Sequence, residues 1–119
     1  MIISNLFWQE MQQILWSSKI TIDRPKGTSH PRYPEKIYPL DYGYLEGTRA
    51  GDNAGIDVWI GTTNSQTLTG ILCTLDTIKK DAEIKLLCGC SQTEVDRVLT
   101  FLGKSMQWIF LEKPQGDIS

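Results

Sequence analysis

Residues 68–88 read LTGILCTL-DTIKKD-AEIKLLC, which is two apolar runs, 68–75 and 82–88, on either side of the polar loop 76–81. Short apolar runs that are bounded by turn formers predict β-strands. The stretch therefore predicts two strands joined as a hairpin. Residues 19–23, 56–60 and 106–111 are further short apolar or alternating stretches, and each predicts one more strand.

Two helices are expected beside these strands. Residues 5–17 form one, with an apolar face made of Leu6, Phe7, Met11, Ile14 and Leu15. The second begins at the capping box Ser91-Gln-Thr-Glu94 and ends at Gly103. Its buried stripe consists of Val95, Val98, Leu99 and Leu102. Several short strands with two peripheral helices favour a small barrel over a parallel α/β sheet.

The composition is that of one globular domain of 119 residues, with 40% hydrophobic and 22% charged side chains. We divide it into a helix (1–18), a barrel that carries the site (19–90), a second helix (91–103) and a final strand with a tail (104–119). The apolar stretches are far shorter than the roughly 20 residues of a membrane span, so no membrane association is expected. Twelve basic against fourteen acidic residues argue against a nucleic-acid partner.

The cysteines and the first residues bear on the compartment. Cys73, Cys88 and Cys90 are an odd number, and the first residues lack the basic and apolar regions of a signal peptide. We therefore expect a reduced, cytoplasmic protein. Cys88 and Cys90 have no second ligand pair for zinc, so buried strand positions are the preferred interpretation.

Residues 24–55 contain all four tyrosines and four of the five prolines. We expect this segment to be mostly an ordered loop, because proline stiffens the backbone and removes a donor. A tyrosine-rich loop on a small scaffold is more typical of a site than of a linker.

Four aspartates form two pairs with equal spacing, Asp52 with Asp57 and Asp76 with Asp81. Residues five apart lie on opposite faces of a straight strand, so each pair converges only if it brackets a bend. Carboxylates that gather at one end of a barrel suit Mg²⁺, which prefers oxygen ligands. The alternative is that these are ordinary turn aspartates.

The stretch Tyr38-Pro-Leu-Asp-Tyr42-Gly-Tyr44, followed seven residues later by Asp52-Asn-Ala-Gly-Ile-Asp57-Val58, resembles the signature of the family I soluble inorganic pyrophosphatases. Two more segments are similar to family motifs: residues 23–33, DRPKGTSHPRY, and residues 74–84, where Asp76 and Asp81 stand five apart. The resemblance covers about residues 19–88. It implies a mainly β fold with two helices, built on an OB-like five-stranded barrel. It also implies magnesium-dependent hydrolysis of pyrophosphate, or of a related phosphate ester or anhydride, in a homo-oligomer.

The resemblance also implies a role for each matching residue. Metal would be held by Asp52, Asp57, Asp76 and Asp81; Tyr42 and Asp57 would be catalytic; and substrate would be bound by Lys26, Arg32, Tyr38 and Lys85. Metal ions neutralise pyrophosphate and lower the pKa of bound water, so side chains mainly position the reactants.

The chain departs from the family pattern at several positions. Ala54 replaces the middle aspartate of the signature, which helps to activate water, and Gly55 and Thr77 replace other family residues. Glu83 stands where a lysine is expected, and Lys85 lies two residues on, on the same strand face. The family's hairpin with a phosphate-binding arginine and its late Tyr-Lys pair are missing.

These departures keep other functions open. The first alternative is a catalytically silent protein that binds a metal–diphosphate ligand or a protein partner. The second is a single-strand nucleic-acid binder that uses the tyrosines and nearby basic residues. His30, Lys79 and Lys80 are weaker candidates for site residues. The tryptophans are expected in the core or in a subunit contact, and Trp59, beside Asp57, is the one candidate for a wall of the site. The aromatic N-terminal helix offers an interface for an oligomer.

Overall fold

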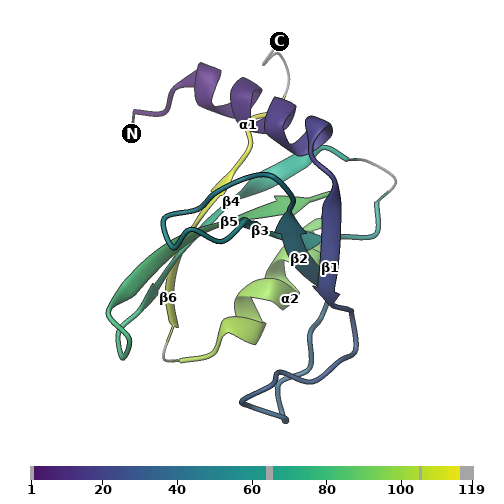
Figure 1. The fold of residues 1–119 in the computed structure, drawn as a ribbon, viewed down its shortest axis with the longest axis vertical. Helices are drawn as coiled ribbons and strands as arrows, with labels where there is room; N and C mark the ends of the chain where they lie inside the picture. The colour runs from purple at the N-terminus through teal and green to yellow at the C-terminus, as the bar shows by residue number, and fades with distance from the viewer. Residues whose placement is uncertain (1, 64–65, 105, 116–119) are drawn as a thin grey trace.

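The computed structural model describes residues 2–63, 66–104 and 106–115, and its centre is a six-stranded sheet that separates two helices (Figure 1). The elements in chain order are α1 (Asn5–Ser17), β1 (Ile20–Arg24), β2 (Asp41–Leu45), β3 (Ile56–Ile60), β4 (Leu68–Asp76), β5 (Asp81–Cys88), α2 (Gln92–Leu102) and β6 (Met106–Glu112). Within the sheet the order is β1-β2-β3-β5-β4-β6. Among the strands of the described residues, only β3 and β5 pair in parallel, and all other neighbours are antiparallel.

The hairpin of β4 and β5 is confirmed. The two strands pair from Leu68 with Cys88 to Asp76 with Asp81. Asp76 Oδ1 closes the turn by accepting hydrogen bonds from the amides of Ile78 (2.9 Å) and Lys79 (3.0 Å).

The mainly β class with two helices is confirmed, but a closed barrel of five strands is not. The sheet has six strands and is open, with β1 and β6 at its edges in the described part of the chain. The additional strand is β2, which lies inside the segment that we expected to be mostly loop. Gly43 at its centre allows a close approach of β1, since a Cβ atom there would collide with the carbonyl oxygen of Thr21. Of the expected C-terminal tail, residues 116–119 lie outside the described residues.

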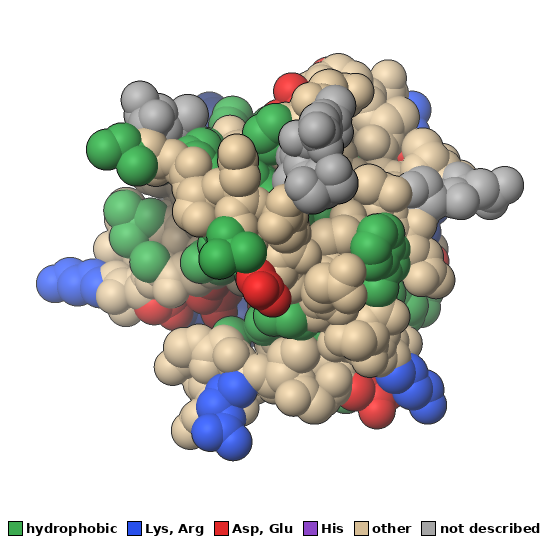
Figure 2. Space-filling model, turned by 90° about the horizontal axis from the view of Figure 1, so that it is seen from above, with side chains coloured by type: hydrophobic (Ala, Val, Ile, Leu, Met, Phe, Trp, Pro, Cys, Tyr) green, Lys and Arg blue, Asp and Glu red, His purple; other side chains and the backbone are tan. Residues whose placement is uncertain are grey.

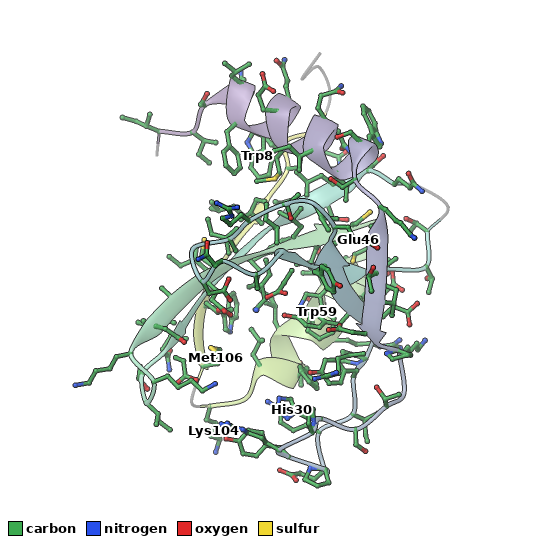
Figure 3. All side chains as sticks on the ribbon, viewed as in Figure 1. Trp8, His30, Glu46, Trp59, Lys104 and Met106 are labelled. Carbon is green, nitrogen blue, oxygen red and sulfur yellow. The ribbon has the colours of Figure 1, made fainter. Side chains whose placement is uncertain are left out.

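The two faces of the sheet carry separate cores. Side chains packed under α1 are Trp8, Leu15, Leu45, Val58, Leu68, Ile71, Leu86 and Cys88. Side chains on the α2 face are Tyr38, Leu40, Trp59, Leu72, Leu87, Val95, Val98 and Leu102. Figure 3 shows Trp8 below α1 and Trp59 on the other side of the sheet, towards α2. Cys73, Cys88 and Cys90 are all free thiols, of which Cys88 is buried.

Helix α1 buries a face that matches the predicted one only in part, since Leu15 is buried and Met11 packs against the core. Trp8, Gln12 and Leu15 are buried, whereas Leu6 is 59% exposed. Gln12 fixes the helix to the sheet, because its side chain donates to the Gln66 carbonyl (3.0 Å) and accepts from the Leu68 amide (2.8 Å). A buried glutamine with hydrogen-bond partners is compatible with a core-facing position, so the polar residue does not mark the solvent side.

Helix α2 follows its sequence signals closely. Ser91 Oγ accepts from the Glu94 amide and the Glu94 carboxylate accepts from the Ser91 amide, so both halves of the capping box are formed. Glu94 also accepts from the amide and hydroxyl of Thr62, which ties the helix to the end of β3. Gly103 ends the helix with a φ of 78°.

Hydrophobic side chains also reach the surface. Figure 2 looks onto the end of the molecule that carries α1 and shows them at several separate places. Trp16 and Ile14 on α1 are 54% and 37% exposed. Neither α1 nor α2 is long and apolar enough to cross a membrane, and they are the only helices of the described chain.

Candidate functional site

Three polar side chains from three neighbouring strands meet around the ammonium group of Lys85. Lys85 Nζ on β5 donates to Tyr42 Oη on β2 (2.9 Å), to Asp57 Oδ2 on β3 (3.0 Å) and to Glu83 Oε2 on β5 (2.9 Å). The register explains the meeting, because Asp57 is the Cα partner of Lys85 and Glu83 lies two residues away on the same face. These residues, Tyr42, Asp57, Glu83 and Lys85, are called the lysine cluster below.

Burial and neighbouring groups together set the protonation states of Lys85 and Tyr42. Lys85 is only 9% exposed. Its burial alone would lower the pKa of the ammonium, but the neighbouring Tyr42 and Asp57 and the bond to Glu83 raise that pKa above its ordinary value of 10.5. Burial raises the pKa of the Tyr42 hydroxyl well above 10. At neutral pH the cluster therefore contains a charged lysine and a neutral tyrosine.

An aromatic wall supports the cluster from the α2 face. The rings of Tyr42 and Trp59 lie 4.6 Å apart between centroids, and Tyr38 lies 5.7 Å from each of them. Phe101 of α2 completes the wall at 4.8 Å from Tyr38. Tyr38 is 6% exposed, so it orders the site from within the core. Trp59 itself is 2% exposed, so it lies in the core as well as beside Tyr42.

A pocket of about 690 Å³ lies between the loop after β2 and strands β3, β4 and β5. Four carboxylate residues line it: Asp52, Asp57, Asp81 and Glu83. Arg49 also lines it, so the pocket carries more acidic than basic residues. Segments far apart in the chain thus bring three of the four expected metal ligands to one cavity.

Asp76 does not line this pocket, although it is the Cα partner of Asp81 across the hairpin. The turn amides that it binds lower the pKa of its carboxyl group, the Lys79 amide most strongly. Asp52 lines the pocket but also has a turn role, because its Oδ1 accepts from the Ala54 amide (3.0 Å). Both residues therefore show the turn chemistry that the sequence left open as the alternative.

The donor chemistry of the pocket fits Mg²⁺, since carboxylate oxygens are its preferred protein ligands. The arrangement of these carboxylates does not fit a bound Mg²⁺ ion as the structure stands. Within the described ranges no three acidic, histidine or cysteine side chains are grouped closely enough to hold one ion. Asp57 is also engaged by Lys85 through Oδ2. An ion at this place would need the acids of the pocket to move together.

The other expected site residues lie in the loop between β1 and β2. Lys26 and Arg32 are exposed, and their backbone amides bond to Asp41 Oδ1 (2.8 Å) and His30 Nδ1 (3.0 Å). The His30 ring stacks on Tyr38 at 6.0 Å. Among the described residues, neither Lys26 nor Arg32 contacts the lysine cluster or lines the acidic pocket.

Two residues of the candidate site were missed by the sequence analysis. Glu83 was considered only as a departure from the family pattern, yet it binds Lys85 directly. Its spacing of two residues from Lys85 on a predicted strand was the signal that places both side chains on one face. Arg49 lies in the pocket lining, and nothing in its sequence surroundings indicated this position.

Comparison with protein-family profiles and with curated protein sequences finds no match for this chain.

Proposed function

We propose that the chain binds pyrophosphate, or a related phosphate ester or anhydride, together with magnesium, and hydrolyses it at the lysine cluster and the adjoining acidic pocket. One observation carries this proposal: Tyr42, Asp57 and Lys85 come together from three strands, and Asp57 also lines the pocket with Asp52 and Asp81. The resemblance of residues 19–88 to family I soluble inorganic pyrophosphatases supports it, because Tyr42, Asp57 and Asp81 match family site positions.

The chemistry of Lys85 suits a phosphate ligand. Its ammonium has three donors that now point to three oxygens, and it stays charged at neutral pH. An incoming phosphate oxygen can replace one carboxylate as an acceptor without leaving the buried charge unpaired. The neutral Tyr42 hydroxyl then orients Lys85 from the side of the aromatic wall.

The carboxylates would hold the cation. Asp52, Asp57 and Asp81 line one pocket, and the loop that carries Asp52 would have to close for them to share one ion. When bound, magnesium supplies charge neutralisation and lowers the pKa of water. In the overall reaction, the oxygen of water bonds to one phosphorus and the bridging P–O bond breaks. Two phosphates are released, and each carries one of the two hydrogens of water.

Phosphate release from pyrophosphate, with and without Mg²⁺, tests this function. We expect magnesium-dependent release by the unchanged chain and a loss of at least about tenfold in Asp57→Asn and in Tyr42→Phe. Asp96→Asn is the matched control, since Asp96 is an exposed acid on α2. Equal rates in Asp57→Asn and in Asp96→Asn would contradict the assignment.

A second function, binding without hydrolysis, is favoured by Ala54 and by the lysine cluster. Ala54 supplies no carboxylate to activate water, and Lys85 already forms ion pairs with both Asp57 and Glu83. Calorimetric titration with pyrophosphate and Mg²⁺ separates the two functions, because a binder releases heat without forming phosphate. In that case Ala54→Asp is expected to restore turnover.

A further inference from the structure

The two edge strands of the open sheet, β1 and β6, differ in how well they are protected against pairing with another strand. Edge strand β1 has a register shift between Ile22 and Arg24, carries the charges of Asp23 and Arg24, and is followed by Pro25. Bulges, charges and proline are the usual protection of a free edge. Edge strand β6 reads MQWIFLE, pairs with β4 without a register shift, and has its one charge at its last residue, Glu112.

The outer edge of β6 presents a regular row of backbone groups. The Lys113 amide donates to the Thr69 carbonyl (2.9 Å). The backbone N–H and C=O groups of the odd-numbered residues of β6 therefore point towards β4. Antiparallel ladders alternate, and the N–H and C=O groups of Met106, Trp108, Phe110 and Glu112 therefore point away from the sheet. No strand of the described chain pairs with this row.

Exposed apolar side chains flank this row on both faces of the sheet. Trp108 on the α2 face is 45% exposed, and Ile109 on the α1 face is 61% exposed. Unpaired backbone groups between two apolar surfaces are a template for another strand. The occupant must therefore be an extended segment with apolar side chains on both faces.

We propose that two copies of the chain pair antiparallel through β6, about a two-fold axis at Ile109, and form one continuous sheet. In this register the backbone groups of all four outward residues find partners on the other chain. Trp108 of each copy lies opposite Phe110 of the other, and Met106 of each copy lies opposite Glu112 of the other. Hydrogen-bonded antiparallel pairs exchange two bonds, so the interface contains about eight inter-chain hydrogen bonds.

A second copy fits this edge because the edge is complementary to itself. Aromatic Trp108 meets the partner's Phe110 on the α2 face, and Ile109 meets the partner's Ile109 on the α1 face. Aromatic and β-branched cross-strand pairs each add to strand pairing. A two-fold interface of this kind also closes, so it leaves neither β6 edge open to further chains.

The molar mass in solution tests the proposal. We expect light scattering at about 100 μM, far above the dissociation constant of a micromolar complex, to give twice the 13.5 kDa of one chain. Trp108→Pro removes an outward N–H without breaking a bond to β4, and it is expected to give a folded monomer. If circular dichroism shows that this variant is unfolded, Trp108→Lys replaces it, with the same expected result. A monomeric unchanged chain, or a dimer that survives the edge variant, would overturn the proposal.

Disulfide formation tests the register. The variant Ile109→Cys is made with Cys73→Ala, because Cys73 is the Cα partner of Ile109 on β4 and would compete for it. Across the axis the two copies of residue 109 form a pair without hydrogen bonds, with Cα atoms about 4.5 Å apart, which a disulfide can span. In the matched control Gln107→Cys the two thiols stand four residues apart along the strands, about 13 Å, and should not join. Cross-linking at 109 and not at 107 supports the register, and the absence of cross-linking at 109 overturns it.

Discussion

Replacing Lys85 with methionine tests whether the lysine cluster is an organised unit. The change keeps an unbranched side chain, one heavy atom shorter, and removes three hydrogen bonds of 2.9–3.0 Å. It also leaves Asp57 and Glu83 facing each other without their shared cation. Removing one partner of a fully buried ion pair costs about 3–5 kcal/mol. The Asp57 and Glu83 side chains are 30% and 38% exposed, so they rehydrate in part, and we expect a loss of about 2 kcal/mol.

Urea unfolding followed by tryptophan fluorescence measures this loss. With a slope of about 1–2 kcal/mol per molar urea, the midpoint should fall by about 1–2 M. Lys79→Met is the matched control, because Lys79 is exposed in the hairpin turn and its loss should change the free energy of unfolding by less than about 0.5 kcal/mol. An effect of Lys85→Met no larger than that of the control would refute the reasoning, since it would mean that the cluster contributes nothing beyond a surface charge.

Three further predictions concern stability. Mg²⁺ should raise the urea midpoint of Lys85→Met more than that of the unchanged chain, because the uncovered carboxylates then attract a cation; equal shifts would argue against a cation site there. Burial would raise the pKa of Glu94, but hydrogen bonds from the backbone and hydroxyl groups of Ser91 and Thr62 outweigh it and lower that pKa. The ionised carboxylate therefore stabilises the fold above the ordinary pKa of 4.5, and this stabilisation is lost as the pH falls below that value. Unfolding of Glu94→Gln should therefore depend less on pH between 5 and 3, and an unchanged dependence would contradict this role. Gly43→Ala should cost about 3 kcal/mol or more, because the new methyl group meets the Thr21 carbonyl, and a thermal midpoint equal to that of the unchanged chain would disprove the close contact.

Local signals in the sequence predicted local structure well. The capping box at Ser91 and Glu94 and the stop at Gly103 depend on neighbouring residues alone, and α2 begins and ends as they indicate. The apolar runs of β4 and β5 also predicted their hairpin, because the connection is only a short turn. Such features need no knowledge of what lies across the fold.

Features that depend on distant partners were harder to predict. Strand β2 was missed because a central glycine and surrounding prolines are typical of loops, whereas Gly43 is needed for close contact with β1. The buried face of α1 was predicted only in part, because Gln12 finds partners at residues 66 and 68, which the helix sequence does not reveal.

The candidate site shows the same division. The spacing of the aspartates predicted bends, and Asp52 and Asp76 do form turn hydrogen bonds. The pairing of Lys85 with Asp57 follows from the parallel register of β3 and β5. This register brings together two residues that are 28 positions apart in the chain. Whether those carboxylates also share a cation depends on the same tertiary arrangement, and no local pattern determines it.

Addition of Mn²⁺ to isotopically labelled protein in the presence of pyrophosphate probes the pocket itself, because this paramagnetic ion replaces magnesium and broadens the resonances of nearby amides. If the acids of the pocket share a cation with the ligand, the amide signals of Asp52, Asp57, Asp81 and Glu83 should disappear first, while those of α2 stay sharp. Uniform broadening, or selective loss at residues far from this pocket, would contradict the account.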